Sequence, residues 1–148
     1  MTTQVKKPWY ITRRGDLLSQ EFLFELAPKQ VIYTGDEPDN DVDYLALFSK
    51  PSNGLITIAV TVKPTEEEIN GVYSIQASEL NKLKKANIPI LFLVIDVKRN
   101  HYFFNWVNEI AKFDNPDPSY LEQSILVPLR HGTAEEIQKL KQEILAIN

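Results

Sequence analysis

The stretch DYLALFSKPSNGLITIAVTVKP, residues 43–64, decides which fold this sequence predicts. Two apolar runs flank the segment SKPSNG, whose Ser, Pro, Asn and Gly residues are typical of a hairpin turn. Side chains alternate between the two faces of a strand, so Thr61 and Lys63 point to the same face. If the two runs pair as a hairpin, Asp43 lies at its open end, close to Thr61 and Lys63. The stretch therefore predicts a hairpin whose open end gathers a carboxylate, a hydroxyl and an ammonium group.

Hydrophobic periodicity on both sides of this hairpin predicts further strands and helices. The run PILFLVIDV is continuously apolar and rich in β-branched residues, which is typical of a strand covered on both faces. Apolar spacing predicts a helix at 15–29, which Pro28 should end, and a second helix at 79–86, which Ser78 can cap. A third helix is expected after the capping box formed by Thr133 and Glu136. Strands are expected at 30–33, 42–48, 55–63, 89–97, 101–106 and 124–129, and a short helix at 106–113. The order α-β-β-β-α-β-β-α-β-α predicts an α/β fold with a mixed sheet flanked by helices.

Composition limits the classes of function. The chain has 148 residues, with 43% hydrophobic and 24% charged residues, which fits one domain spanning 1–148. It contains no cysteine, which excludes disulfides, thiolate zinc sites and a cysteine nucleophile. A net charge of −4 means that any contact with nucleic acid must come from a local basic patch. No signal-like apolar core follows MTTQVKKPWYITRR and no run is long enough to span a membrane, so a cytoplasmic protein without membrane association is expected.

Asp43 and Lys63 carry the residue types of a divalent-metal hydrolase. A carboxylate binds a hard cation such as Mg²⁺ or Mn²⁺, which polarises a phosphoryl oxygen and lowers the pKa of a bound water. A lysine beside it orients or deprotonates that water and offsets the developing charge. Asp43 and Asp41 are the candidate metal ligands, Asp43 and Lys63 the candidate catalytic residues, and Thr61 lies between them on the second strand. A solvated loop carboxylate and a solvent-facing strand lysine are the simpler alternatives.

These motifs resemble the PD-(D/E)XK restriction-endonuclease-like superfamily, and more closely an uncharacterised bacterial branch of it. The resemblance spans about residues 13–111, and a C-terminal strand and helix at 124–147 complete the domain. It implies a restriction-endonuclease-like sheet and, where the site is intact, Mg²⁺- or Mn²⁺-dependent hydrolysis of phosphodiester bonds. The segments that carry it are RRGDLLSQEFLFEL, DVDYLALF, AVTVKP and LFLVIDVKRNHYFFNWVNEI.

The chain departs from that pattern at two ligand positions. Ser19 occupies the helix position where the branch has Glu, and Thr61 occupies the usual acidic or Gln position. One carboxylate and a neutral hydroxyl make a poor Mg²⁺ site, unless Asp41, Asp39 or Glu21 supplies charge. We therefore expect a catalytically impaired module that binds a partner. An active nuclease using Asp43 and Lys63 is the alternative, and a different fold is the third hypothesis.

Basic and histidine residues elsewhere offer weaker candidates. The candidate phosphate contacts are Lys82, Lys84, Lys85, Lys98 and Arg99. The aromatic side chains of HYFFNW could stack on unpaired bases, but a place in the core is the favoured interpretation. His101 and His131 lack the spacing of paired zinc ligands, and the acidic run DEPDND lacks the pattern of a calcium loop. A nucleic acid, a protein partner or a second copy of the chain are the partners considered.

Overall fold

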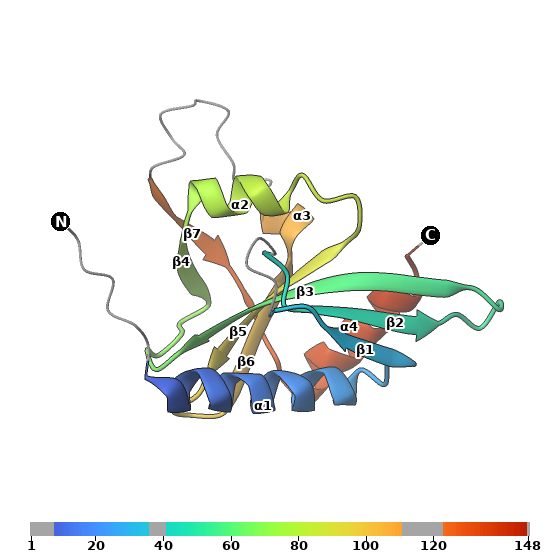
Figure 1. Ribbon diagram of the computed structural model, residues 1–148, viewed down its shortest axis with the longest axis horizontal. Coiled ribbons are helices and arrows are strands. Elements are labelled where there is room, and N and C mark those ends of the chain that lie inside the picture. The colour runs from blue at the N-terminus through green and yellow to red at the C-terminus, as the bar shows by residue number, and fades with distance from the viewer. Residues whose placement is uncertain (1–7, 36–40, 111–122, 148) are drawn as a thin grey trace.

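Six strands form a mixed sheet through the middle of the molecule, in the order β1-β2-β3-β5-β6-β8 (Figure 1). The computed structural model describes residues 8–35, 41–110 and 123–147. Its helices are α1 (Trp9–Glu25), α2 (Ala77–Leu83), α3 (Val107–Ile110) and α4 (Ala134–Leu145). Its strands are β1 (Gln30–Tyr33), β2 (Tyr44–Ser49), β3 (Leu55–Thr65), β4 (Val72–Gln76), β5 (Ile90–Asp96), β6 (His101–Trp106), β7 (Ser124–Pro128) and β8 (Arg130–His131).

The central strand β5 explains why the sheet is mixed. It pairs parallel with β3 on one side and antiparallel with β6 on the other, and all seven of its residues are buried. Both faces of β5 are covered, as its unbroken apolar run predicts. The structure thus confirms the α/β class and the mixed sheet flanked by helices.

Two apolar clusters cover the two faces of this sheet. On one face α1 and α4 pack against Leu91, Leu93 and Ile95 of β5. On the other face α2, α3 and the separate two-stranded β4–β7 sheet pack against the alternate residues Phe92 and Val94. Strand alternation thus divides one apolar strand between two cores.

The predicted hairpin is present, with Tyr44 opposite Val60 and Ser49 opposite Leu55. β3 runs two residues beyond the predicted Lys63, because it pairs with β5 as far as Thr65. Pro64 is tolerated inside this strand for a geometric reason. Alternate amides point to the same side of a strand, so the nitrogen of Pro64, like that of Val62, points toward the β2 side of the sheet. The pairing with β2 ends at Val60, so no ladder hydrogen bond is lost at Pro64.

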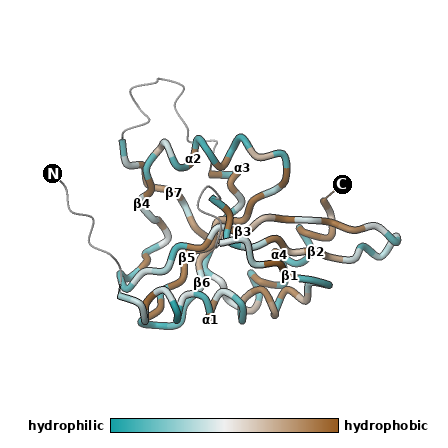
Figure 2. The backbone as a smooth tube through the Cα atoms, in the orientation of Figure 1, coloured by the Kyte–Doolittle hydropathy of each residue, from teal (hydrophilic) through white to brown (hydrophobic). Residues whose placement is uncertain are grey.

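Helix α1 begins at Trp9, six residues before the predicted start at Gly15, and ends before Pro28. Its hydrophobic and hydrophilic residues alternate along its length, as Figure 2 shows. Gly15 brings the helix very close to β3, because a Cβ atom there would lie 2.7 Å from the Cβ of Pro64. A glycine is therefore required by close packing at this crossing.

Several local predictions need correction. Ser78 is not the cap of α2, because the helix starts at Ala77 and Gln76 precedes it without a side-chain cap bond. Strands β4 and β8 were not predicted, and β7 pairs with β4 outside the main sheet. Thr133 does cap α4, since its hydroxyl accepts the amide of Glu136. Residues 36–40 of the acidic run, 111–113 of the predicted short helix and the loop 114–120 lie outside the described residues.

Among the described helices, none combines the length and apolar character that a membrane crossing needs.

Candidate functional site

Asp43 lies directly before β2 and extends its pairing with β3. Its amide donates to the carbonyl of Val60 (2.9 Å), and its Oδ2 accepts the amide of Val62 (2.7 Å). Because β2 begins at Tyr44, no strand carbonyl of β2 lies opposite that amide. The carboxylate of Asp43 therefore takes the place of a backbone acceptor at the open end of the hairpin.

The electrostatic surroundings raise the pKa of Asp43. Burial is the largest cause, and the negative charges of Asp16 and Glu79 add to it. The hydrogen bond from Val62 and the positive charge of Lys63 act in the opposite direction. Burial and like charge together outweigh these two, so Asp43 holds a proton more readily than a solvated aspartate.

Thr61 lies on β3 directly after Val60, where the pairing with β2 ends, and is buried. Its Oγ1 donates to the carbonyl of Asp41 (2.8 Å). The hydroxyl of Thr34 likewise donates to the carbonyl of Val42 (2.8 Å). Two threonine hydroxyls thus hold the chain in place just before Asp43, and Asp41 contributes its backbone while its residue is exposed.

Lys63 forms an ion pair with Glu79, which lies in the first turn of α2. Each of the two side chains is 31% exposed. Lys63 points to the same face as Thr61, as strand alternation predicts, and that is the face that α2 covers. Glu79 was missed in the sequence because local periodicity does not reveal which strand a crossover helix will face.

The α1 carboxylate that acts on Asp43 is Asp16 and not Glu21. Glu21 instead accepts a hydrogen bond from Tyr102, and burial together with this acidic neighbour raises the pKa of Tyr102 to about 12. Ser19, at the position where the resemblance implies Glu, is buried and donates to the carbonyl of Asp16 (2.9 Å), which leaves its Oγ to accept from the hydroxyl of Tyr44 (3.2 Å). Its hydroxyl serves the packing of α1 on β2.

These residues do not fit a Mg²⁺ or Mn²⁺ ion. Within residues 8–35, 41–110 and 123–147, no three His, Asp or Glu side chains are grouped to hold a metal. Nor does this part of the chain contain a buried side-chain nitrogen or oxygen that lacks a hydrogen-bond partner. One oxygen of Asp43 already accepts an amide, and the Thr61 hydroxyl is committed to a carbonyl. Asp39, a third candidate ligand, lies outside the described residues.

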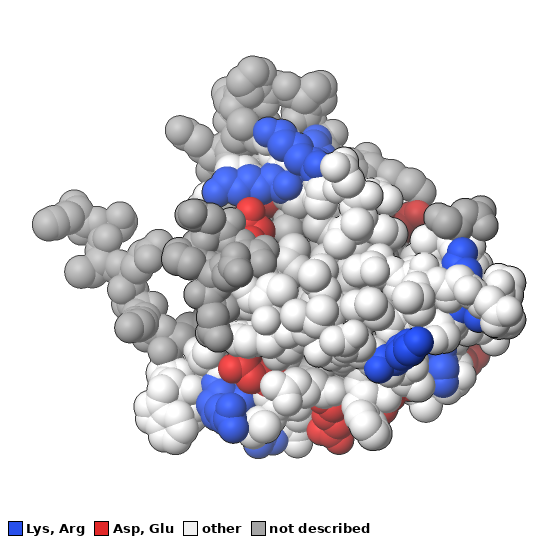
Figure 3. All heavy atoms as spheres, turned by 45° about the vertical axis from the view of Figure 1, so that its right-hand side comes forward, with Lys and Arg blue, Asp and Glu red and all other residues white. Residues whose placement is uncertain are grey.

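The basic residues form two separate patches. Lys82, Lys84 and Lys85 lie at the end of α2, where Figure 3 shows blue side chains at the top of the molecule. Lys98 and Arg99 follow the far end of β5, roughly 20 Å away by the length of a seven-residue strand. Arg99 is also committed, because its Nη1 bonds Asp96 Oδ2 at 3.0 Å. The strand between them, β5, is buried along its whole length and contributes no basic surface that would join the two patches.

The aromatic residues of β6 belong mainly to the core, as the favoured interpretation predicted. Phe103 and Phe104 are buried on opposite faces of the sheet. Trp106 is partly buried, and its Nε1 donates to Glu143 (3.1 Å). Tyr102 packs on Phe22 with ring centroids 5.3 Å apart. These contacts do not leave a row of exposed rings on β6 for base stacking.

Pairing of β6 with β8 brings His101 and His131 together, although thirty residues separate them in the sequence. Their ring centroids are 5.2 Å apart, and His131 stacks on Phe103 at 4.8 Å. This proximity was missed because β8, a two-residue strand, has no periodicity to reveal it. Neither histidine belongs to a three-residue ligand group within the described parts of the chain.

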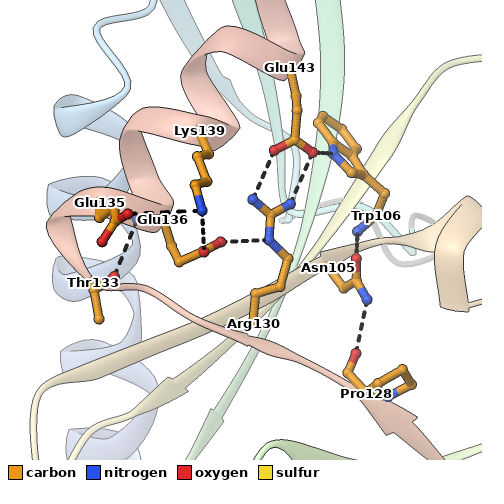
Figure 4. A network of polar contacts seen from close by, with 9 residues as sticks. All are labelled: Asn105, Trp106, Pro128, Arg130, Thr133, Glu135, Glu136, Lys139 and Glu143. Carbon is orange, nitrogen blue, oxygen red and sulfur yellow. Dashed lines mark hydrogen bonds and ion pairs between the residues drawn. The ribbon is translucent and has the colours of Figure 1, made fainter.

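A second polar cluster, the Arg130 network, joins the sheet to α4 (Figure 4). Arg130 donates from Nε to Glu136 (3.0 Å) and from Nη1 and Nη2 to Glu143 (3.0 and 2.8 Å). Its guanidinium also lies 4.8 Å from the ring centroid of Phe104. Hydrogen bonding to Arg130 lowers the pKa of Glu136, so this network holds its carboxylates in the charged form.

Comparison of the sequence with known protein families finds no match, and comparison with curated proteins finds no relative. The resemblance to the PD-(D/E)XK superfamily therefore stays a prediction from the motifs.

Proposed function

We propose that this chain is a binding or interaction module with a nuclease-like fold and an impaired catalytic site. One observation carries the proposal: each of the three site residues Asp43, Thr61 and Lys63 already has an intramolecular partner. Asp43 accepts the amide of Val62, Thr61 donates to a carbonyl, and Lys63 pairs with Glu79.

The chemistry of phosphodiester hydrolysis explains why these contacts matter. A hard cation needs several anionic oxygens, and a catalytic lysine must be available to the attacking water or the developing charge. Here Lys63 is neutralised by Glu79, and Asp43 supports the pairing of two strands. Each residue has a structural role that accounts for it without catalysis.

The first experiment is a calorimetric titration of Mn²⁺ and of Mg²⁺ into the wild-type protein. Asp43→Asn is the matched control, because an amide oxygen still accepts the Val62 amide while the negative charge is lost. We expect no saturable binding in either protein, and no cleavage of DNA or RNA. Saturable binding that Asp43→Asn abolishes, together with metal-dependent cleavage, would overturn the proposal in favour of a nuclease using Asp43 and Lys63. Asp41→Asn would then test the second candidate ligand.

A further inference from the structure

The outward face of α1 carries a row of apolar side chains, Tyr10, Leu17 and Phe24. They are spaced by seven residues, so they lie on one side of the helix. Tyr10 and Leu17 are each 51% exposed and Phe24 is 83% exposed. The core-facing side of the same helix holds other residues, such as Leu18 and Phe22. An amphipathic helix needs only one apolar side, so the second one requires an explanation.

An apolar groove of about 670 Å³ adjoins the C-terminal half of this row. It lies between α1 and the edge strand β1, and its apolar lining includes Leu23, Phe24, Val31 and Tyr44. At the opposite end of the helix, Trp9 is 79% exposed. On a helical wheel Trp9 lies on the same side of the row as Gln20 and Leu23, which line the groove. The helix thus has an exposed aromatic side chain at one end and an apolar groove at the other.

Charge is also divided along α1. Arg13 and Arg14 lie in its N-terminal half, whereas Glu21 and Glu25 lie in its C-terminal half. The first turn has no acidic residue and the last turn no basic one, so the charges do not complement the helix dipole. Along the lower border of the molecule, where α1 lies, Figure 3 shows blue side chains at one end and red ones further along.

We propose that α1 is a self-association surface, on which the α1 helix of a second copy packs antiparallel. Centred on Leu17, this pairing places Tyr10 against Phe24 of the second copy, and Arg13 against its Glu21. The basic half of each helix then faces the acidic half of the other, whereas a parallel pair would align like charges. The exposed Trp9 comes to the end of the second copy where the groove opens.

This surface lies apart from Asp43 and Lys63, so the inference goes beyond the proposed function. Metal binding at Asp43 would overturn the proposed function and leave this inference untouched, whereas a monomeric protein would overturn this inference alone. The same experiment distinguishes other partners of this surface. If α1 binds an unrelated amphipathic helix, the protein alone stays monomeric; if two copies pair through the edge of β1, the dimer survives substitutions in α1.

Sedimentation equilibrium over a range of concentrations tests the proposal. We expect a reversible dimer whose dissociation constant rises about tenfold or more with Leu17→Glu, because a charge would be buried at the centre of the contact. Leu126→Glu on β7 is the matched control, since Leu126 is 66% exposed on another element, and we expect it to leave the dimer unchanged. A wild-type protein that is monomeric throughout, or a dimer equally stable in both variants, overturns the proposal.

Charge reversal tests the antiparallel direction. Arg13→Glu should weaken the dimer, and Arg13→Glu combined with Glu21→Arg should restore it. Because Glu21 also bonds Tyr102, thermal unfolding must confirm that the double variant folds; if it does not, the salt dependence of the wild-type dimer replaces it. A dimer that Arg13→Glu leaves unchanged, a folded double variant that stays weak, or a dimer indifferent to salt overturns this pairing.

Discussion

Two clusters of charged side chains join helices to the sheet, and they differ in how completely their charges are matched. Around Lys63, one ammonium pairs with Glu79 while Asp43 and Asp16 add further negative charge. Around Arg130, one guanidinium makes three hydrogen bonds to two glutamates. The pKa values of the carboxylates differ accordingly: the pKa of Asp43 is raised and that of Glu136 is lowered.

This difference separates two uses of buried or half-buried charge. The planar guanidinium of Arg130 directs three N–H bonds toward carboxylate oxygens, which favours the charged carboxylates and holds α4 against the sheet. A single lysine among three carboxylates leaves negative charge in excess. Negative excess is a condition for binding a cation, but within the described parts of the chain no three acidic or histidine side chains are grouped to hold one. The Lys63 cluster is therefore the place where a small change in sequence has the largest functional consequence.

Replacing Thr61 by Glu should have the largest effect. The new carboxylate would lie at a buried position of β3, next to the Val62 amide that Asp43 accepts, so we expect the free energy of unfolding to fall by about 3 kcal/mol or more. Mn²⁺ should recover part of this loss, because the pair of carboxylates forms a hard-cation site. Chemical denaturation with and without Mn²⁺ measures both effects.

Thr61→Val is the matched control for this change. It removes the bond to the Asp41 carbonyl but adds no charge, and it should cost about 1 kcal/mol whether or not Mn²⁺ is present. If Thr61→Glu and Thr61→Val were equally destabilised and equally indifferent to Mn²⁺, Thr61 would not lie beside Asp43.

Removing each central cation compares the two clusters directly. Arg130→Met should lower the free energy of unfolding by about 2–3 kcal/mol, because two glutamates lose several hydrogen bonds. Lys63→Met should cost about 1 kcal/mol or less, since its single ion pair is partly exposed to solvent. Urea denaturation of both variants gives the comparison. An equal loss in the two variants would mean that hydrogen-bond geometry does not distinguish the clusters.

The smallest expected effect is a pair of opposite responses to pH. The folded pKa of Asp43 is above its ordinary 3.8, so its contribution to stability is greatest below that value and falls as pH rises through the folded pKa. The folded pKa of Glu136 is below its ordinary 4.5, so its contribution is present above that value and is lost as pH falls through the folded pKa. Asp43→Asn should flatten the first response and Glu136→Gln the second. Urea midpoints from about pH 3 to about pH 7 test both, and identical profiles for the two variants would contradict the assigned directions.

The sequence predicts the elements that local patterns determine. The hairpin, the buried strand β5 and the Thr133 cap of α4 follow from turn residues, an apolar run and a capping box. Strands β4 and β8 escape prediction because they are short and partly exposed, and their partners lie far away in the sequence. The early start of α1 is missed because the outward apolar residues disturb the expected period.

The candidate site likewise contains residues that the sequence predicts and residues that it does not. Strand alternation and hairpin register bring Asp43, Thr61 and Lys63 together, and both are visible in the sequence. Asp16 and Glu79 reach the site from helices that cross the sheet, and no local pattern specifies where such a crossing occurs. Motif matching alone thus reveals a carboxylate and a lysine but not the partner that neutralises the lysine.

The two-sided pairing of β3 has a consequence for the order of folding. Residues Leu55–Val60 pair with β2, whereas Ala59–Thr65 pair with β5, so only two residues are bonded into both ladders. The first ladder closes a short local turn, while the second must wait for the whole crossover through β4 and α2. The strand is therefore completed in two stages, with the half that carries Lys63 joining the sheet last. The Asp43 carboxylate bonds Val62, two residues beyond the overlap, so this side chain ties the local hairpin to the half of β3 that otherwise pairs through β5 alone.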